Sequence, residues 1–255
     1  MQLLTIVKIG GKIVEDPESL TAFLKDFASI AGDKILVHGG GRSATVLAEK
    51  LGIETKMTDG RRITDQEMLK VVTMVYGGLV NKNMVAQLQM LHLDAIGLTG
   101  ADMNLILSEK RPVKEIDYGF VGDIKEINAP ALIDLLKQNY VPVIAPLTHD
   151  GKGNLLNTNA DTIAGEIAKA LAFDFNVRLI YCFEKKGVLL NENDESSVIS
   201  TLNFDLFQQY KNEGMIQGGM IPKLDNAFQA IASGVKQAII THASDINSGK
   251  GTYLQ

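Results

Sequence analysis

Short apolar runs alternate with helical patterns along this chain, and this alternation most constrains its fold. The run LLTIVKIGG precedes the helical pattern DPESLTAFLKDFASIAG, and KILVHGGG precedes SATVLAEKLG. Apolar runs of this length, bounded by glycine, are typical of buried strands. Strands that alternate with helices form parallel sheets that helices cover on both faces. The sequence therefore predicts an α/β fold, a three-layer αβα sandwich with a mainly parallel central sheet.

Local signals place several of the expected elements. Asp16 and Gly32 mark the N-cap and the end of one helix. A longer amphipathic stretch covers residues 64–91, and we expect the glycine pair inside it to cause a kink. Residues 104–128 contain short extended segments around a proline and a glycine, which predicts a β-hairpin. The pattern restarts with a strand over residues 175–183, so any domain boundary lies just before it.

Composition excludes several classes of protein. The 255-residue chain has a net charge of −5 and 45% hydrophobic residues, which argues against a nucleic-acid partner. No apolar run approaches the roughly 20 residues of a membrane span, and the N-terminus lacks a signal-peptide pattern. The single cysteine, Cys182, excludes an internal disulfide and suits a reducing compartment. We expect a cytoplasmic protein with no nucleic-acid or membrane partner.

Four glycine-rich turns are candidates for phosphate binding: Gly10-Gly11, Gly39–Gly41, Gly97–Gly100 and Gly218-Gly219. Three of them directly follow predicted strands, whose carboxyl ends hold the ligand site in open parallel sheets. Bare amides at a helix N-terminus bind anions, although any one of these turns could equally be an ordinary tight turn. The P-loop, dinucleotide-binding and protein-kinase motifs are all absent, so a phosphate site here would use another architecture.

Two lysines lie beside these glycines, Lys8 at the end of the first strand and Lys223 just inside a helix. Together they predict two cations placed on phosphoryl oxygens, although each taken singly could be a solvated surface residue. Asn157, Asn159 and Asp161 alternate, so in extended backbone they would share one face. Such a row could bind a carboxylate or an amide and hold a lysine, and the alternative is an N-cap cluster.

Two further side chains are informative. Arg62 could bind a carboxylate through its planar guanidinium, or it could be an exposed turn residue. His38 ends the second predicted strand, and no other histidine or cysteine lies at metal-ligand spacing from it. We therefore expect a structural role for His38 and no metal site built from side chains.

Six motifs, in this order, resemble those of the amino acid kinase family: VKIGGK, VHGGGR, DGRRIT, RPVKEIDYGFVGDI, LNTNADTIA and GGMIPKLDNA. They cover nearly the whole chain, and they look most like members that phosphorylate an N-acylated glutamate. The resemblance implies a carbamate kinase-like fold with an acyl-glutamate-binding and dimerisation lobe, residues 1–172, and an ATP lobe, residues 173–255. It implies transfer of the ATP γ-phosphoryl group to the side-chain carboxylate of N-acetyl-L-glutamate, the second step of arginine biosynthesis.

The resemblance also assigns roles to residues. Lys8 and Lys223 would stabilise the transferring phosphoryl group, and Asp161 would hold both lysines. Magnesium would arrive mainly on ATP, because it keeps several waters and needs few protein ligands. The acceptor site would comprise Gly40, Gly41, Arg62, Asn157 and Asn159, the phosphate site Gly10 and Gly11, and the nucleotide site Cys182, Glu184, Gly187, Gly218, Gly219 and Met220.

This sequence departs from the family pattern at several positions. Glu184 and Gly218 each stand where the family usually has aspartate, and a late Asp-Gly-Arg segment is missing. Arg61 stands where an aliphatic residue is common. It could favour a more anionic acyl group, as in N-succinyl-L-glutamate, or it could be an ordinary surface arginine.

A homodimer built on residues 64–91 is expected from the resemblance. In the family that the sequence resembles, the members that arginine inhibits carry a helix before the first strand. This chain starts almost at its first strand, so arginine feedback is not expected. The alternatives are a kinase that acts on N-succinyl-L-glutamate, carbamate, aspartate, glutamate or UMP, and a non-catalytic amino-acid or nucleotide sensor on the same fold. Retention of Lys8, Asp161 and Lys223 argues against the sensor.

Overall fold

A computed structural model describes residues 1–58, 61–191 and 193–255. Its main sheet comprises β1 (Leu3–Ile9), β2 (Asp33–His38), β5 (Ala95–Leu98), β8 (Val141–Ile144), β11 (Asn176–Phe183), β12 (Thr201–Leu202), β13 (Gln237–His242) and β14 (Thr252–Leu254). The strand order is β12-β14-β13-β11-β1-β2-β8-β5. Strands β13 and β14 pair antiparallel, and the other neighbours pair parallel. The predicted mainly parallel central sheet is confirmed.

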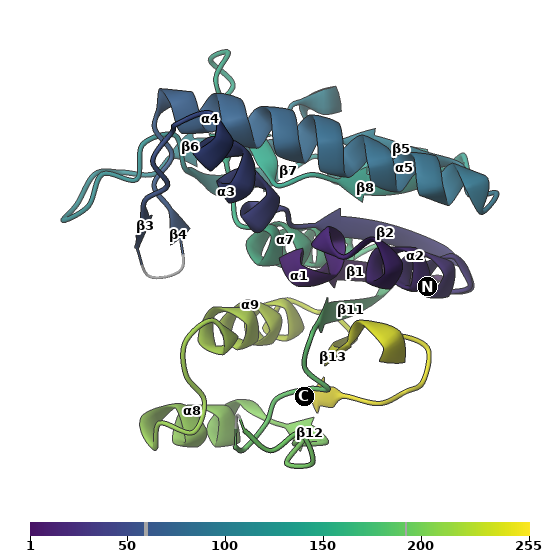
Figure 1. Ribbon diagram of the computed structural model, residues 1–255. Helices are drawn as coiled ribbons and strands as arrows, with labels where there is room; N and C mark the ends of the chain where they lie inside the picture. Colours follow the sequence, from purple (N-terminus) through teal and green to yellow (C-terminus); the bar gives the residue numbers. More distant parts are fainter. Residues whose placement is uncertain (59–60, 192) are drawn as a thin grey trace.

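Helices cover both faces of this sheet, so the chain forms three layers (Figure 1). One face carries α1 (Gly11–Glu15), α2 (Pro17–Ala28), α3 (Gly41–Lys50), α4 (Gln66–Val72), η1 (Thr73–Val80), α5 (Asn81–Met90) and η3 (Ala243–Asp245). The other face carries α6 (Ala129–Lys137), α7 (Ala160–Leu171), α8 (Phe204–Asn212) and α9 (Met220–Ala232). A separate cluster of buried apolar side chains lies beneath each helical layer, as the predicted αβα sandwich requires.

Strand β1 shows how alternating side chains build both clusters. Leu4 and Ile6 belong to the cluster beneath α7, whereas Val7 and Ile9 belong to the cluster beneath the opposite helices. Because side chains alternate with a period of two, Lys8 lies on the same face as Leu4 and Ile6, at the carboxyl end of the strand. The strand therefore aims the Lys8 ammonium toward α7.

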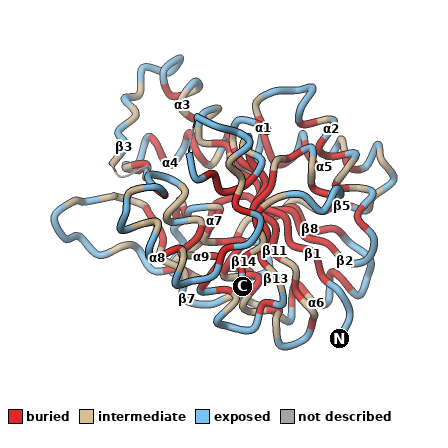
Figure 2. Tube along the Cα trace, turned by 90° about the horizontal axis from the view of Figure 1, so that it is seen from below, coloured by how far each residue is buried: buried red, intermediate tan, exposed pale blue. Residues whose placement is uncertain are grey.

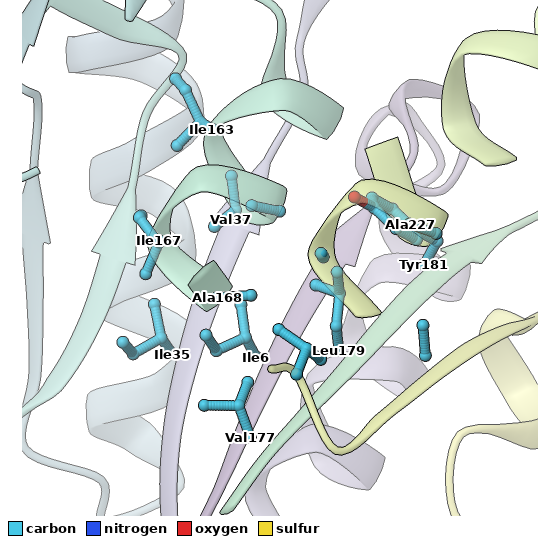
Figure 3. Close-up of a cluster of buried hydrophobic side chains, with 14 of the residues drawn as sticks. Ile6, Ile35, Val37, Ile163, Ile167, Ala168, Val177, Leu179, Tyr181 and Ala227 are labelled. Atoms are coloured by element: carbon cyan, nitrogen blue, oxygen red, sulfur yellow. The ribbon is translucent and has the colours of Figure 1, made fainter. Parts of the chain in front are cut away.

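The cluster beneath α7 joins the two halves of the chain. Figure 3 shows Ile6 and Ile35 of the sheet close to Ile167 and Ala168 of α7, with Leu179 of β11 beside them. Figure 2 shows that burial is concentrated in the central strands, while the surrounding loops are largely exposed. Strand β11 pairs with β1 along its whole length, from Leu3 with Asn176 to Ile9 with Cys182. The main sheet is thus continuous across the expected boundary at residues 172–173.

A four-stranded sheet, in the order β10-β9-β6-β7, lies apart from the main sheet. It comprises β6 (Ile106–Lys110), β7 (Gly122–Ile127), β9 (Leu147–His149) and β10 (Leu155–Asn157), with the short helix η2 (Asp102–Asn104) before β6. Strands β6 and β7 pair antiparallel, which confirms the hairpin expected within residues 104–128. A further two-stranded ribbon, β3 (Met57–Thr58) and β4 (Arg61–Arg62), projects from one end of the molecule (Figure 1).

The predicted helix signals are confirmed in part. The Asp16 carboxylate accepts a hydrogen bond of 2.8 Å from the backbone N–H of Ser19, as expected of the N-cap of α2. The helix ends at Ala28, however, before Gly32. Residues 66–90 form a helical run in which the glycine pair lies inside the π-helical η1, where the sequence predicted a kink. No helix among the described residues is long and apolar enough to cross a membrane.

Neighbouring leucines of β1 test the packing of the central strand. The Leu4 side chain is fully buried, whereas Leu3 is 45% exposed. Leu4→Ala should lower the free energy of unfolding by about 2–5 kcal/mol, because it leaves a cavity between the sheet and its helices. Leu3→Ala, the matched control, should cost less than about 1 kcal/mol. Denaturant unfolding at equal protein concentration compares them, and equal losses would contradict this packing.

Candidate active site at the carboxyl ends of the central strands

A cleft of about 680 Å³ opens where the central strands end. The glycine turns after β1 and β2, Gly10-Gly11 and Gly39–Gly41, both line it, and so does Phe183 at the end of β11. These three strands are adjacent and parallel, so their carboxyl ends meet at one edge of the sheet. The expected convergence of glycine turns is thus confirmed for these two turns. The turn at Gly97–Gly100 lies elsewhere and bonds to β9 through Gly100 N and Leu147 O at 2.7 Å.

Lys8, Asp161 and Lys223 form an ion cluster in this cleft, in which Lys8 and Asp161 are buried and Lys223 is partly exposed. Lys8 Nζ lies 2.7 Å from Asp161 Oδ1, and Lys223 Nζ lies 3.3 Å from Asp161 Oδ2. The three side chains come from β1, the first turn of α7 and the first turn of α9. Burial by itself raises the pKa of Asp161, but the two ammonium groups outweigh it and hold that pKa below its usual value. One carboxylate therefore faces two lysines, and the cluster keeps a net positive charge.

Arg62 is buried in the cleft, and it faces polar groups without an acid. Its Nη2 donates to Gly41 O at 2.6 Å and to Thr45 Oγ1 at 2.8 Å, and its Nη1 donates to Thr55 Oγ1 at 3.3 Å. Among the described residues no carboxylate lies within ion-pair distance of this guanidinium. A buried cation without a counter-charge favours the binding of an anion. Arg62 lines the cleft, so the structure places it inward rather than in an exposed turn.

The glycines at this end allow close approach. A Cβ on Gly40 would lie 3.0 Å from the ring of Tyr76, which belongs to η1 and lines the cleft. The Gly41 carbonyl accepts from Arg62, and Gly41 begins α3. Glycine is thus required at position 40 by the Tyr76 ring. The Gly10 amide donates to Cys182 O at 2.9 Å, so this amide is used within the fold, while Gly11 begins α1.

Asn157, Asn159 and Asp161 all line the cleft, but they do not form one extended row. Asn157 ends β10, Asn159 is the N-cap of α7, and Asp161 lies in the first turn of that helix. Asn159 Oδ1 accepts from the amides of Asp161 and Thr162 at 2.8 and 3.1 Å. The expectation of a shared extended face was therefore wrong, and the N-cap alternative is correct for Asn159.

His38 is a structural residue, as the sequence predicted. It is fully buried, its Nδ1 lies 2.7 Å from Gly39 O, and its Nε2 lies 3.1 Å from Nδ2 of Asn81. A neutral ring that donates through Nδ1 and accepts through Nε2 satisfies both contacts. Burial lowers the pKa of His38 to about 4. Within the described part of the chain, no group of three or more histidine, cysteine or acidic residues could hold a metal ion.

The residues predicted to bind the nucleotide differ in whether they line the cleft. Glu184 lines the cleft and forms an ion pair with Lys12, with 2.8 Å between Oε1 and Nζ. Cys182 lies in the apolar cluster beneath α2, and burial raises the pKa of its thiol, so its side chain does not reach the cleft. The remaining predicted nucleotide residues lie outside the cleft lining, within the described residues: Gly187, Gly218, Gly219 and Met220.

The sequence did not single out three features of the cleft. Tyr76 lies in an apolar helical stretch, whose pattern predicts a core residue. The Arg111–Asp123 ion pair, with Nη2 2.5 Å from Oδ1, joins β6 to β7 and lines the cleft, but only the hairpin pairing brings the two together. Lys12 directly follows the first glycine pair, and this position could have identified it as a candidate site residue. Gly60 of the motif DGRRIT lies outside the described residues.

Comparisons with known proteins agree with this architecture. A model of the amino acid kinase family matches residues 4–242. An acetylglutamate kinase of Parabacteroides distasonis is 67% identical over 99% of this chain and 99% of its own length. The crystal structure of smu.665 from Streptococcus mutans has a TM-score of 0.81 at 27% identity, covering 99% of this chain and 98% of that one. Carbamate kinase from Giardia lamblia bound to AMP-PNP has a TM-score of 0.73 at 14% identity, covering 99% and 98%, and shares the fold.

The chain belongs to the amino acid kinase family. This confirms the resemblance that the six sequence motifs carried, and it makes the protein an ATP-dependent kinase with a carbamate kinase-like fold.

The neutral state of His38 predicts a dependence of stability on pH. An unfolded histidine takes up a proton near pH 6.5, whereas the folded ring does so near pH 4. Protons therefore favour the unfolded chain between these values, and stability is lost as pH falls from about 6.5 to about 4. The loss from this group should approach about 3 kcal/mol. His38→Gln should flatten that part of the pH profile of urea unfolding, and parallel profiles would refute it.

Proposed function

We propose that this protein is an acetylglutamate kinase. It transfers the γ-phosphoryl group of ATP to the side-chain carboxylate of N-acetyl-L-glutamate, giving N-acetyl-L-glutamyl 5-phosphate and ADP, in arginine biosynthesis. The observation that carries this proposal is the pair of lysines around Asp161, in a cleft that also holds Arg62, a buried cation without an acidic partner among the described residues. The full-length identity of 67% to a protein named acetylglutamate kinase supports the choice of acceptor.

The chemistry requires positioning and neutralisation of charge. A glutamate side-chain carboxylate is already ionised at neutral pH, so it attacks without a general base. Charge on the transferring phosphoryl oxygens must be stabilised as the bond to the leaving ADP breaks. Lys8 and Lys223 would supply that charge, because Asp161 holds their ammonium groups at opposite oxygens of one carboxylate. Asp161 would act as a positioning residue and keep both side chains ordered before substrate arrives.

The acceptor would lie between the lysines and Arg62. In the structure the Arg62 guanidinium contacts two hydroxyls and a carbonyl. The α-carboxylate of the acceptor would bind the N–H groups that these contacts leave available. The amide Nδ2 of Asn157, 2.9 Å from Thr64 Oγ1, and the free side of Asn159 would bind the acyl-amide region. The glycines at 40 and 41 leave room for the carboxylate that attacks, and Gly11 offers an amide to the phosphoryl group.

The nucleotide would enter beside Glu184 and the turn before α9. Magnesium would come on the nucleotide, bound by phosphate oxygens and water, and the ion would neutralise charge on the phosphates. This fits the cleft, because both oxygens of Asp161 face lysines and no acidic cage is present among the described residues. Gly187, Gly218, Gly219 and Met220 belong to the C-terminal lobe, residues 173–255, and would contact the part of the nucleotide that extends beyond the cleft lining and away from the N-terminal lobe, residues 1–172.

A homodimer in the cytoplasm is part of the same proposal. Met74, Leu79 and Met90 lie on the helical run η1–α5 and are 51%, 58% and 64% exposed. Three large apolar side chains on one helical run favour an interface with a second copy of the chain. A mass measurement in solution distinguishes a dimer from a monomer.

Removal of either lysine should mainly slow turnover. Lys8→Ala and Lys223→Ala should each lower kcat at least about 100-fold, with a smaller change in the KM of the acceptor, because their contacts strengthen in the transition state. Lys34→Ala is the matched control, since Lys34 is equally buried but caps the end of α2 by donating to Ala28 O at 2.8 Å. It should lower stability and leave kcat near the wild-type value. Unchanged kcat in Lys8→Ala or Lys223→Ala would refute the role of that lysine.

A second acceptor, N-succinyl-L-glutamate, is favoured by one observation. Arg61 lines the cleft, and its guanidinium could meet the extra carboxylate of a succinyl group. ADP release should be measured with N-acetyl-L-glutamate, N-succinyl-L-glutamate, carbamate, aspartate, glutamate and UMP.

The proposed function predicts the highest kcat/KM for N-acetyl-L-glutamate. If the succinyl compound is preferred and Arg61→Leu removes that preference, the second acceptor is correct. Turnover with none of the six, despite ATP binding, would support a sensor instead.

A further inference from the structure

An exposed ion pair lines the cleft. Lys12, in the first turn of α1, follows Gly10 and Gly11 directly, and its Nζ lies 2.8 Å from Oε1 of Glu184. Glu184 follows the end of β11, so the pair connects the segments after two neighbouring strands of the sheet. Both side chains line the same cleft as Lys8 and Lys223.

The ion pair between Lys12 and Glu184 is too exposed to contribute much to the stability of the fold. The side chains of Lys12 and Glu184 are 63% and 39% exposed. Ion pairs at such exposure contribute only about 0–1 kcal/mol, because water and salt screen them. What the pair does determine is where the Lys12 ammonium lies, within the lining of the cleft that also contains Lys8 and Lys223.

The cleft lining carries an excess of positive charge, which favours the binding of a multiply charged anion. Among the described lining residues, seven side chains are cationic and four are acidic. Asp161 is committed to Lys8 and Lys223, and Asp123 is committed to Arg111. The Lys12 side chain is 63% exposed, whereas those of Lys8, Lys223 and Arg111 are 9%, 21% and 20% exposed, so the Lys12 pair exchanges its partner at the lowest cost in desolvation.

We propose that Lys12 is a third phosphate-binding cation, and that Glu184 holds it over the cleft until a nucleotide enters. On binding, the Lys12 ammonium leaves the carboxylate and contacts the phosphates next to the group that Lys8 and Lys223 stabilise. A side chain held near its destination loses less conformational freedom when it binds. The inference rests on the proposed function only in that the ligand is a nucleotide.

Nucleotide binding without acceptor tests this, so that turnover does not enter the result. Titration calorimetry should compare MgATP, MgADP and adenosine on the wild-type protein, Lys12→Gln, Glu184→Gln and Lys70→Gln. Lys70 is the matched control, because its pair with Glu67 has a similar separation of 2.7 Å and similar exposure but lies on α4, outside the cleft lining.

Lys12→Gln should weaken MgATP and MgADP binding about tenfold, since a charge-assisted contact is lost, and leave adenosine binding unchanged. Glu184→Gln should strengthen MgATP binding a few-fold, because the competing carboxylate is gone. Lys70→Gln should bind all three ligands like the wild type.

Unchanged MgATP affinity in Lys12→Gln would overturn the proposal, and so would an equal loss for adenosine and MgATP. Weaker adenosine binding in Glu184→Gln would make Glu184 a nucleoside ligand and overturn its holding role. These outcomes are independent of the acceptor. A protein that binds MgATP through Lys12 but phosphorylates no acylated glutamate would refute the proposed function and leave this inference standing.

Discussion

The cleft depends on one carboxylate, Asp161, held between two ammonium groups. Lys8, Asp161 and Lys223 come from β1, α7 and α9, so the ion cluster exists only when these three elements are packed together. Each charge buried alone would be costly, and removing the carboxylate would leave two like charges facing each other. The cluster keeps one uncompensated positive charge at the end of the strands. The fold thus prepares a place where an anion lowers the free energy of the whole site.

The layered fold and part of the site were readable from the sequence, for physical reasons. The spacing of apolar residues reports burial directly, so the alternation of strands and helices and the hairpin of β6 and β7 followed from it. Lys8 was recognisable because a charged side chain ending a buried strand needs a partner. The position of Asp161 on a helix was left open, because the alternation of Asn157, Asn159 and Asp161 fits a polar row in extended backbone, whereas asparagine is also a preferred N-cap residue.

Other site features depend on contacts between distant segments. Tyr76 has the sequence context of a core residue, and only its packing over Gly40 places it at the cleft. Lys12 and Glu184 are 172 positions apart, and the pairing of β1 with β11 brings them together. The side chain of Cys182 points into the apolar layer because the alternation along β11 sends its neighbours to the other face. A motif fixes which residues follow a strand, but the register of the sheet decides which of them meet.

Two arginines of the cleft, Arg62 and Arg111, illustrate how pairing decides what a cation can bind. Arg111 is neutralised by Asp123 through a short, two-pronged contact, so it stiffens the hairpin and offers little net charge. Arg62 contacts only neutral oxygens and a sulfur atom, and it retains its full charge. Similar side chains at two positions of one cleft therefore differ in function according to whether an acid was placed beside them.

The central position of β1 has a consequence for synthesis of the protein. This strand leaves the ribosome before both of its partners and can pair early with β2, but β11 follows it by more than 160 residues. At roughly 5–20 residues per second, the open edge of β1 waits on the order of ten to thirty seconds. The unpaired N–H and C=O groups along this edge, in a strand rich in Leu, Ile and Val, are a template for wrong pairing during that interval. Early docking of α2 would cover one apolar face of the strand but not this edge, and slow codons before β11 would lengthen the time for which the edge stays open.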